Sequence, residues 1–148
     1  MLFLSSFANK VDAKGRAAVP ATFRAACAGD AFAGVVLFRS FTGKCIEGMT
    51  MARMETLADA TDSGDIFDAK LDELTAMLFA DARQLAFDVT GRIVIPADLL
   101  AHAGIDGEAV FVGRGRSFQI WSPAEFARVQ AESLSKLQSE KPTLVLRK

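Results

Sequence analysis

Two stretches of this chain are nearly the same, and that duplication limits what the chain can fold into more than any other feature. Residues 11–21 read VDAKGRAAVPA and residues 87–97 read FDVTGRIVIPA. At a separation of 76 residues, five pairs of positions coincide: Asp12 and Asp88, Gly15 and Gly91, Arg16 and Arg92, Pro20 and Pro96, and Ala21 and Ala97. An internal repeat constrains the whole architecture. We therefore expect one strand–turn–strand–helix unit to occur twice.

Each copy carries the chemistry of a tight turn followed by a helix. The side chain of Asp12 or Asp88 can accept hydrogen bonds from downstream backbone amides, and Gly15 or Gly91 can adopt a positive φ without steric cost. An arginine then begins the returning strand, which ends at a proline. Proline cannot continue a β-ladder, but its fixed φ suits the start of a helix. These two aspartates and two glycines are the expected turn-forming residues.

Hydrophobic periodicity and turn residues place further elements around the two copies. Strands are expected at residues 3–11, 16–19, 35–39, 45–47, 92–95, 109–112 and 117–121, with one more leading into Asp88. Helices are expected at 21–28, from Thr50 through residue 57, at 67–82, at 96–103 and after a capping box at 122–125. Residues 59–65 should form an acidic loop, and 139–148 a poorly ordered tail.

This pattern predicts an α+β protein built from four successive segments. They are a first repeat (5–52), a helical connector (53–83), a second repeat (84–126), and a C-terminal helix and tail (127–148). Each repeat has only about 50 residues, which is marginal for an independent core, so we expect the repeats to share one. Hydrophobic residues make up 51% of the chain. This apolar excess favours subunit contacts, and we expect a homo-oligomer.

The composition disfavours several classes of protein. Cys27 and Cys45 lack CxxC spacing, so we expect two buried thiols in a reducing compartment and no metal site. His102 is the only histidine, and no triad, metal set or phosphate loop is visible, so we expect no enzyme, cofactor or small-molecule substrate. No apolar run approaches the ~18 residues of a membrane span, and the first residues lack a secretory signal. We expect a cytoplasmic protein without a membrane partner.

Charge is distributed unevenly along the chain. The net charge is −1, but residues 55–73 contain seven acids and one base, a local charge of −6, which leaves +5 for the remainder. Between residues 10 and 24, four bases face only one acid, Asp12; the bases are Lys10, Lys14, Arg16 and Arg24. Such local asymmetry decides partners better than the total charge does. The first copy therefore has the charge of a nucleic-acid contact.

The doubled motif gives the chain a specific resemblance. The pattern D-x-K-G-R with P-A-x-F-R, then D-x-x-G-R-I-x-I-P-A-x-L and I-W-S, resembles the MraZ family of bacterial transcriptional regulators, in the AbrB/SpoVT superfamily, over roughly residues 3–130. The resemblance implies a duplicated swapped-hairpin β-barrel (AbrB-like) in one chain with flanking helices, and a ring-shaped homo-oligomer. It also implies a nucleoid-associated regulator that binds short G-rich repeats in double-stranded DNA and usually represses the division and cell-wall gene cluster.

Three sites in the first copy depart from the family pattern. Ala17–Ala18 stand where a larger aliphatic residue is usual, Ser5 replaces a glycine, and Gly48–Met49 replace a valine–aromatic pair. The D-x-x-G-R motif itself is intact.

The arginines of the two copies are the candidate DNA-reading residues. A β-ribbon can enter the major groove of DNA, where arginine contacts guanine O6 and N7 bidentately. We expect Arg16 to read bases in this way, and Arg92 is its counterpart in the second copy. The remaining candidates, which would contact phosphates, are Lys10, Lys14 and Arg24.

Two alternatives remain open from the sequence. The aspartate–arginine pairs could be ion pairs that only brace their turns, and Arg92 has basic neighbours only if the turn carrying Arg114 and Arg116 lies close. The protein could also be a non-DNA oligomeric scaffold or protein-interaction module whose acidic face engages a basic partner. Salt-dependent binding to DNA separates a regulator from such a scaffold.

Overall fold

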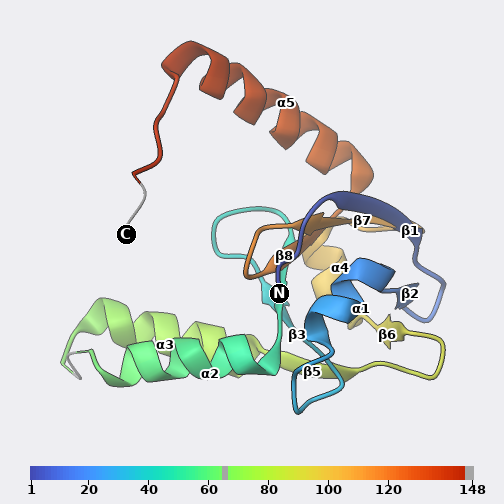
Figure 1. Cartoon of the computed structure of the whole chain (residues 1–148), viewed down its shortest axis with the longest axis horizontal. Helices are drawn as coiled ribbons and strands as arrows, with labels where there is room; N and C mark the ends of the chain where they lie inside the picture. The colour runs from blue at the N-terminus through green and yellow to red at the C-terminus, as the bar shows by residue number, and fades with distance from the viewer. Residues whose placement is uncertain (65–66, 146–148) are drawn as a thin grey trace.

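The structure, a computed structural model, describes residues 1–64 and 67–145 and has an α+β fold (Figure 1). Within these residues the strands are β1 (Ser6–Lys10), β2 (Arg16–Ala18), β3 (Gly34–Arg39), β4 (Ile46–Met49), β5 (Arg83–Ala86), β6 (Arg92–Val94), β7 (Glu108–Gly113) and β8 (Phe118–Trp121). The helices are α1 (Ala21–Cys27), α2 (Met51–Asp62), α3 (Ala69–Asp81), α4 (Ala97–Ala103) and α5 (Pro123–Glu140).

Strands from the two halves of the chain alternate within one antiparallel sheet. Its order is β1-β7-β8-β4-β3-β5, so β1 lies beside β7 of the second half and β5 lies beside β3 of the first. At the centre, β4 pairs with β8, and Glu47 lies opposite Gln119. The two halves therefore share one sheet and one core, as the small size of each repeat predicts.

The two short strands that carry the arginines form a separate pair. β2 and β6 run antiparallel with Ala17 opposite Ile93, and we call this pair the β2–β6 ribbon. The arginine strand was expected to pair with the strand before its own turn, but only one isolated bridge, Val11 to Ala17, joins β1 to β2. Each three-residue strand instead forms its ladder with its counterpart from the other half, while the carbonyls of Arg16 and Arg92 accept from the N–H groups of Asp12 and Asp88 across their own turns.

The expected closed β-barrel is not formed by the described residues. The six-stranded sheet is open, and its edge strands are β1 and β5. Closure would require continuous ladders from these edges into β2 and β6. In the part of the chain that the structure describes, the bridge of Val11 to Ala17 is isolated, and the only ladder of the ribbon is the one between its own two strands.

A cluster of aromatic rings fills the main core. Phe23 of α1 is fully buried and meets Phe3 edge-on, with ring centroids 5.3 Å apart. It also contacts Phe7 at 5.7 Å and Phe118 at 5.4 Å. A second, smaller core lies where α2 and α3 pack on the sheet; its buried members are Val36, Phe38, Met49, Met54 and Leu78. Both cysteines are buried free thiols, as expected.

Each departure from the family pattern has a local explanation. A Cβ at Gly48 would lie 2.3 Å from the ring of Phe118, so that ring occupies the space a side chain would need. Ala17 is small, but its cross-strand partner Ile93 is large, and both are buried. Ser5 has a φ of 72°, a left-handed conformation that glycine adopts more readily.

Helix boundaries differ from expectation in the acidic segment. α2 continues to Asp62, so the acidic segment expected to be a loop is partly helical, and Asp65 lies outside the described residues. Alanines at 58 and 60 favour helix and outweigh the charge of the neighbouring aspartates. In the connector, α3 begins only at Ala69, and Phe67 is 89% exposed rather than part of an apolar stripe.

The remaining helix signals are confirmed, with small shifts in position. The hydroxyls of Thr50 and Ser122 accept hydrogen bonds from the backbone N–H of residues 53 and 125, as expected of N-caps. Pro20 and Pro96 occupy the N-cap position itself rather than the first helical turn. α5 extends to Glu140, so the tail begins later than expected.

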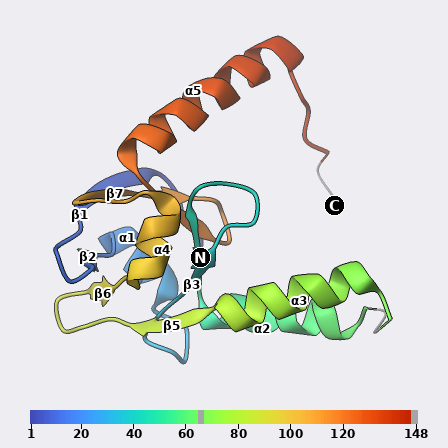
Figure 2. The same cartoon turned by 180° about the vertical axis from the view of Figure 1, so that it is seen from behind.

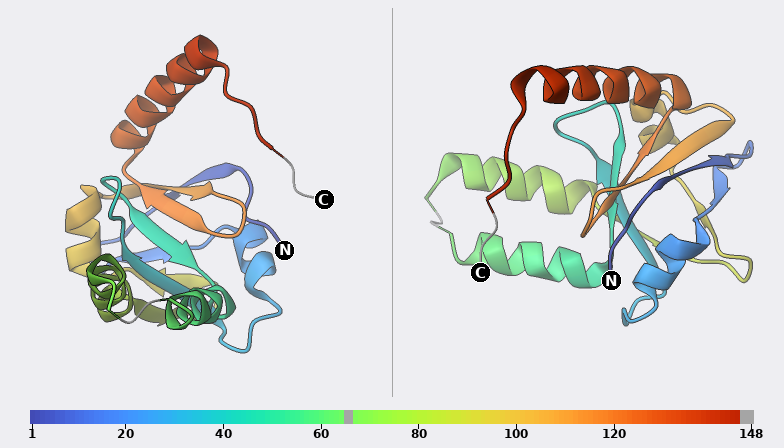
Figure 3. Two further views of the ribbon diagram at one scale, coloured as in Figure 1. Left: turned by 90° about the vertical axis from the view of Figure 1, so that its left-hand side faces the viewer. Right: turned by 45° about the horizontal axis from the view of Figure 1, so that its top comes forward.

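The turns with the ribbon, the α2–α3 hairpin and helix α5 lie on three different sides of the six-stranded sheet. The turns at residues 12–15 and 88–91 lie together at one end, beside the ribbon, and the α2–α3 hairpin projects from the other end (Figures 1 and 2). α5 forms a separate arm on another side of the sheet (Figure 3). Among the described residues, no helix combines the length and apolar character needed to cross a membrane.

The first turn supplies a prediction for stability. Gly15 has a φ of 85°, and a Cβ there would lie 2.5 Å from the carbonyl oxygen of Ile95. Gly107 has a similar φ of 76° but nothing within 4 Å of such a Cβ, so Gly107→Ala isolates the backbone strain of about 1–2 kcal/mol. Urea unfolding should show a larger loss for Gly15→Ala, because a backbone carbonyl must also move. Equal losses would contradict the close approach.

Candidate nucleic-acid interface

The outer face of the β2–β6 ribbon presents both motif arginines. Ala17 and Ile93 point into the core, and side chains alternate along a strand. Arg16, Ala18, Arg92 and Val94 therefore share the outer face. In the register, Arg16 lies opposite Val94 and Ala18 lies opposite Arg92, so the two arginines are diagonal neighbours.

Asp12 organises the first turn through its carboxylate. One oxygen, Oδ1, accepts from the backbone N–H groups of Lys14 and Arg16, both at 2.9 Å. The other oxygen, Oδ2, accepts from Nε of Arg16 at 2.6 Å. Gly15 donates its backbone N–H to the Asp12 carbonyl at 3.0 Å and closes the turn. The turn is thus held by bonds that all lie within five residues.

Asp88 repeats this arrangement in the second turn. Its Oδ1 accepts from the backbone N–H groups of Thr90 and Arg92, each at 2.9 Å. Its Oδ2 accepts from Nε of Arg92 at 2.9 Å. The Thr90 hydroxyl adds a bond of 2.8 Å to Oδ1. The two motifs are therefore alike in geometry as well as in sequence.

The bracing ion pair and an exposed arginine are both present at each turn. The side chains of Arg16 and Arg92 are 39% and 41% exposed. Each uses Nε on its aspartate, and no hydrogen bond or ion pair within residues 1–64 and 67–145 engages the terminal Nη groups of either arginine. Bracing by aspartate thus fixes the direction of a guanidinium whose outer edge stays open.

The aspartates are held in their ionised form. Backbone hydrogen bonding from Arg16, together with the side-chain bond from the same residue, lowers the pKa of Asp12 below its ordinary value of 3.8. Backbone hydrogen bonding from Arg92 lowers the pKa of Asp88 well below the same value. A permanent carboxylate in each turn keeps its arginine anchored across the physiological pH range.

The other candidate residues, Lys10, Lys14 and Arg24, differ in how far their side chains are engaged within the protein. Lys14 lies within the first turn and is exposed, and Lys10 ends β1 opposite Glu108. Arg24 is half-buried: its Nη1 donates to the Val19 carbonyl, and its guanidinium lies against Gly91, where an added Cβ would come within 2.7 Å. Arg24 of the first half therefore supports the turn of the second half.

The turn with Arg114 and Arg116 does not lie beside Arg92. Gly115 is bridged to Phe3, with a hydrogen bond of 2.7 Å from the Phe3 N–H to the Gly115 carbonyl. β1 then runs from this point toward the Asp12 turn, and a strand of its length spans about 17 Å. The condition under which these arginines would flank Arg92 is not met.

An ion-pair cluster where α3 leads into β5 was not expected from the sequence. Asp81, only 9% exposed, accepts from both the backbone N–H and Nε of Arg39, at 2.9 and 3.0 Å. Arg83 of β5 pairs with Asp98 of α4 at 2.6 Å and so joins this strand to the helix. The only available signal was the sequence of opposite charges at these four positions, which does not reveal their pairing.

Two further kinds of site, a metal site and a reactive cysteine, are not found among the described residues. No group of three or more His, Cys, Asp and Glu side chains in the described parts of the chain could hold a metal ion. Burial raises the pKa of Cys27 and of Cys45 to about 11, so both thiols stay protonated near neutral pH.

Acid should weaken the second turn through Asp88. Because folding lowers the pKa of Asp88, its contribution to stability is complete above 3.8 and is lost as pH falls toward the folded value. Wild type should therefore be more stable than Asp88→Asn at neutral pH, and the difference should shrink between about pH 5 and about pH 2.5. Chemical unfolding across this range measures it.

A carboxylate outside the turns is the control for acid unfolding. Asp59 lies exposed on α2 and forms no ion pair with any described residue. The difference between wild type and Asp59→Asn should stay small throughout. A difference for Asp88→Asn that does not change with pH would contradict the assigned hydrogen bonds.

Known proteins resemble the chain along most of its length. Residues 78–147 match the family model described as "MraZ protein, putative antitoxin-like". A relative named Transcriptional regulator MraZ, from Rickettsia bellii (strain OSU 85-389), is 40% identical over 95% of this chain and 93% of its own. A protein of the same name from Rickettsia peacockii (strain Rustic) is 39% identical over 86% of this chain and 85% of its own. Another from Rickettsia canadensis (strain McKiel) is 38% identical over 95% of this chain and 93% of its own. The chain belongs to the MraZ family, whose members are transcriptional regulators and not enzymes.

Proposed function

We propose that this protein is a sequence-specific DNA-binding transcriptional regulator whose β2–β6 ribbon enters the major groove. One observation carries the proposal: Arg16 and Arg92 share the outer face of the ribbon, each anchored through Nε with its terminal groups open. Arginine reads guanine by directing two N–H groups at O6 and N7. An anchored side chain loses less conformational entropy on binding than a free one.

The spacing of the arginines suits neighbouring bases. Diagonal positions on an antiparallel pair lie about 7–8 Å apart, close to two steps of about 3.4 Å along a DNA strand. Both arginines of one ribbon can therefore face the same short run of guanines. This agrees with the short G-rich repeats that the family resemblance implies.

Phosphate contacts would then come from the residues around the ribbon. Lys14 is exposed in the turn beside Arg16, and Lys10 ends the strand that leads into it. We assign them to phosphates, which position a protein without specifying sequence. Arg24 retains some freedom for such a contact, although its bond to Val19 makes support of the second turn its main role.

We also propose that the fold arose by duplication of a swapped-hairpin unit. The sheet order is unchanged when β1, β3 and β4 are exchanged with β5, β7 and β8, and β2 pairs with its counterpart β6. The proposed parts are a first repeat at 5–52, a connector at 53–83, a second repeat at 84–126 and a C-terminal arm at 127–148. Strand exchange between the repeats makes the ribbon a joint product of both.

The biological role follows from the family. Relatives that cover most of the chain are named transcriptional regulators, and we propose repression of the division and cell-wall gene cluster by a nucleoid-associated protein. The acidic α2–α3 hairpin projects from the end opposite the ribbon (Figure 1). Its charge would repel DNA from that end and orient the ribbon toward the duplex.

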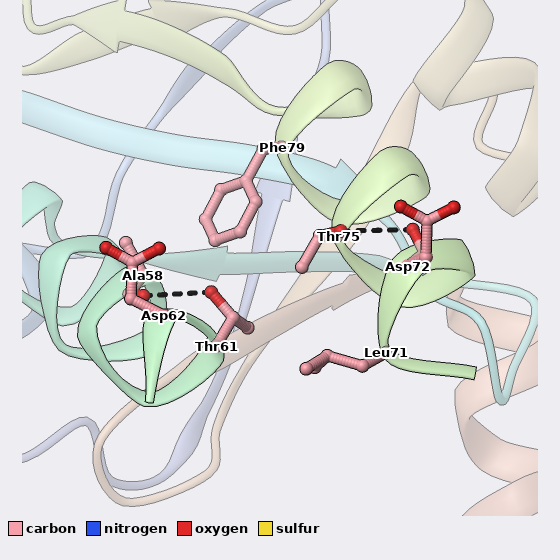
Figure 4. Close-up of a pocket in the computed structure, with 7 residues that line it drawn as sticks. All are labelled: Ala58, Thr61, Asp62, Leu71, Asp72, Thr75 and Phe79. Atoms are coloured by element: carbon pink, nitrogen blue, oxygen red, sulfur yellow. Dashed lines mark hydrogen bonds between the residues drawn. The ribbon is translucent and has the colours of Figure 1, made fainter. Parts of the chain in front are cut away.

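A homo-oligomeric ring is the assembly that we propose. α5 has no buried residue, and Leu134 and Leu137 on it are 56% and 54% exposed. A groove of about 430 Å³ opens between α2 and α3, with Phe79 and Leu71 directed into it (Figure 4). It continues toward the sheet as a second groove of about 480 Å³, which Phe79 also lines together with Met51 and Met54.

The exposed apolar side of α5 in one subunit can pack into the α2–α3 groove of another subunit. Methionine side chains adapt to a helix that docks against them. When the last turns of α5 from one subunit occupy the α2–α3 groove of the next, the contact joins two different surfaces. Such a head-to-tail contact closes into a ring if the rotation per subunit allows it.

Charges placed on the apolar side of α5 should dissociate the assembly. Leu134→Asp/Leu137→Asp should reduce the mass from a multiple of 15.9 kDa toward the monomer, because the apolar contact is lost. Ser135→Asp/Ser139→Asp adds the same two charges to the other side of the helix and should leave the mass unchanged. Light scattering decides between these outcomes, and a wild type that is already monomeric contradicts the ring.

Removal of one ribbon arginine should weaken specific binding without unfolding the protein. Arg16→Ala should weaken binding to the preferred DNA by about 1–3 kcal/mol, and Arg16→Lys should not restore it. Its melting temperature should fall less than that of Asp12→Ala, because Asp12 also accepts two backbone bonds. Lys14→Ala should weaken all DNA alike and lower the salt slope by about one.

The control for charge is Arg128→Ala. Arg128 also pairs with carboxylates, but it lies on α5 away from the ribbon. It should retain full affinity in the same titrations. An Arg16→Ala protein that binds its preferred DNA at full strength contradicts the reading role. Absence of any salt-dependent DNA binding by wild type would instead favour the oligomeric scaffold.

A further inference from the structure

An exposed apolar residue lies directly beside the first motif arginine. Val94 of β6 is 54% exposed and is the cross-strand partner of Arg16 on the outer face of the ribbon. The equivalent position in the first half is Ala18, which lies opposite Arg92. The two arginines therefore have different neighbours: a branched apolar side chain beside one and a single methyl group beside the other.

Position and stiffness distinguish Val94 from other exposed apolar residues. Directly opposed side chains have Cβ atoms about 4.5–5.5 Å apart, so Val94 moves with Arg16 wherever the ribbon docks. Its β-branch restricts χ1, so its methyl groups have a defined direction. Val89 is more exposed, but it lies in the second turn and has no cross-strand partner in the ribbon.

We propose that Val94 recognises the 5-methyl group of a thymine next to the guanine read by Arg16. This inference rests on the proposed DNA-binding function and adds a specificity-determining residue to it. In the major groove, the thymine methyl is the one apolar group on the edge of a base pair, and apolar side chains recognise it by contact. The separation of Val94 from Arg16 is of the same order as one base step of about 3.4 Å.

The two halves of the chain should therefore differ in the bases that they recognise. Ala18 has no atoms beyond Cβ, so it reaches less far into the groove beside Arg92. The guanine read by Arg16 should therefore require a thymine next to it, whereas the guanine read by Arg92 should tolerate any base at the corresponding position. A duplicated motif would thus read an asymmetric sequence, which fixes the direction in which each subunit lies on a direct repeat.

Replacement of thymine by deoxyuracil removes only the methyl group and tests this contact directly. The DNA upstream of the protein's own gene is first narrowed by protection to the bound segment, and each thymine is then replaced singly. Wild type should lose about fourfold in affinity at one thymine next to a guanine, the loss expected for one buried methyl group. The Val94→Ala protein should bind thymine and uracil at that position equally.

Ala18→Val supplies the matched gain of function. It places the same side chain beside Arg92, and it should create a second uracil-sensitive position next to the other guanine. If Val94→Ala keeps the same sensitivity to uracil as wild type, the proposal is wrong. It is also wrong if Val94→Ala changes the particle mass in light scattering, because Val94 then lies in a subunit contact.

Failure of this inference is distinguishable from failure of DNA recognition. Replacing guanine with 7-deazaguanine removes N7, the acceptor proposed for Arg16. Binding that depends on N7 but is indifferent to every thymine methyl overturns the role of Val94 and leaves the arginine role intact. Binding that is indifferent to both overturns the proposed function itself.

Discussion

The structure depends on the pairing of β2 with β6, because this pairing brings the two turns together from opposite halves of the chain. The backbone N–H of Ile95 donates to the Gly15 carbonyl at 2.8 Å, and that of Val19 donates to the Gly91 carbonyl at 3.1 Å. These bonds continue the ribbon into both turns. Because backbone hydrogen bonds set the register, the spacing of the two arginines does not depend on flexible side chains.

The two halves reach the same turn geometry with different supports. In the first half, Phe7 of β1 meets Phe23 of α1 edge-on and joins the strand to the helix through the core. In the second half, Arg83 and Asp98 make the corresponding connection from β5 to α4 by an ion pair. Ion pairs near the surface stabilise a fold less than aromatic burial does. Arg24, packed on Gly91, adds a contact that the first turn lacks.

Local features of the candidate site could be predicted from the sequence because their bonds span only a few residues. The bonds from Asp12 to the backbone of Lys14 and Arg16, and the cap at Thr50, lie within reach of the residues that form them. In the structure both aspartates accept backbone hydrogen bonds within their turns. Their arginine partners nevertheless stay partly exposed, since one guanidinium has separate edges for an ion pair and for a further contact.

Features that depend on contacts between the halves could not be predicted in the same way. Alternation along β2 does not show whether its partner is β1 or β6, and this choice decides between a hairpin and a ribbon shared by both repeats. The pairing of Arg39 with Asp81 joins residues 42 positions apart. The family resemblance suggested a closed barrel. The open sheet shows that similar motifs do not determine whether the edge strands pair and close the sheet.

Methylation interference on the DNA upstream of the protein's own gene tests whether the β2–β6 ribbon reads guanines in the major groove. Methylation of guanine N7 modifies the major groove, where the ribbon is proposed to bind, whereas methylation of adenine N3 modifies the minor groove. If the ribbon reads guanine, N7 methylation of guanines within each repeat should abolish binding, and N3 methylation of adenines in the same repeats should not. Binding that tolerates methylated guanines but fails on methylated adenines would contradict it.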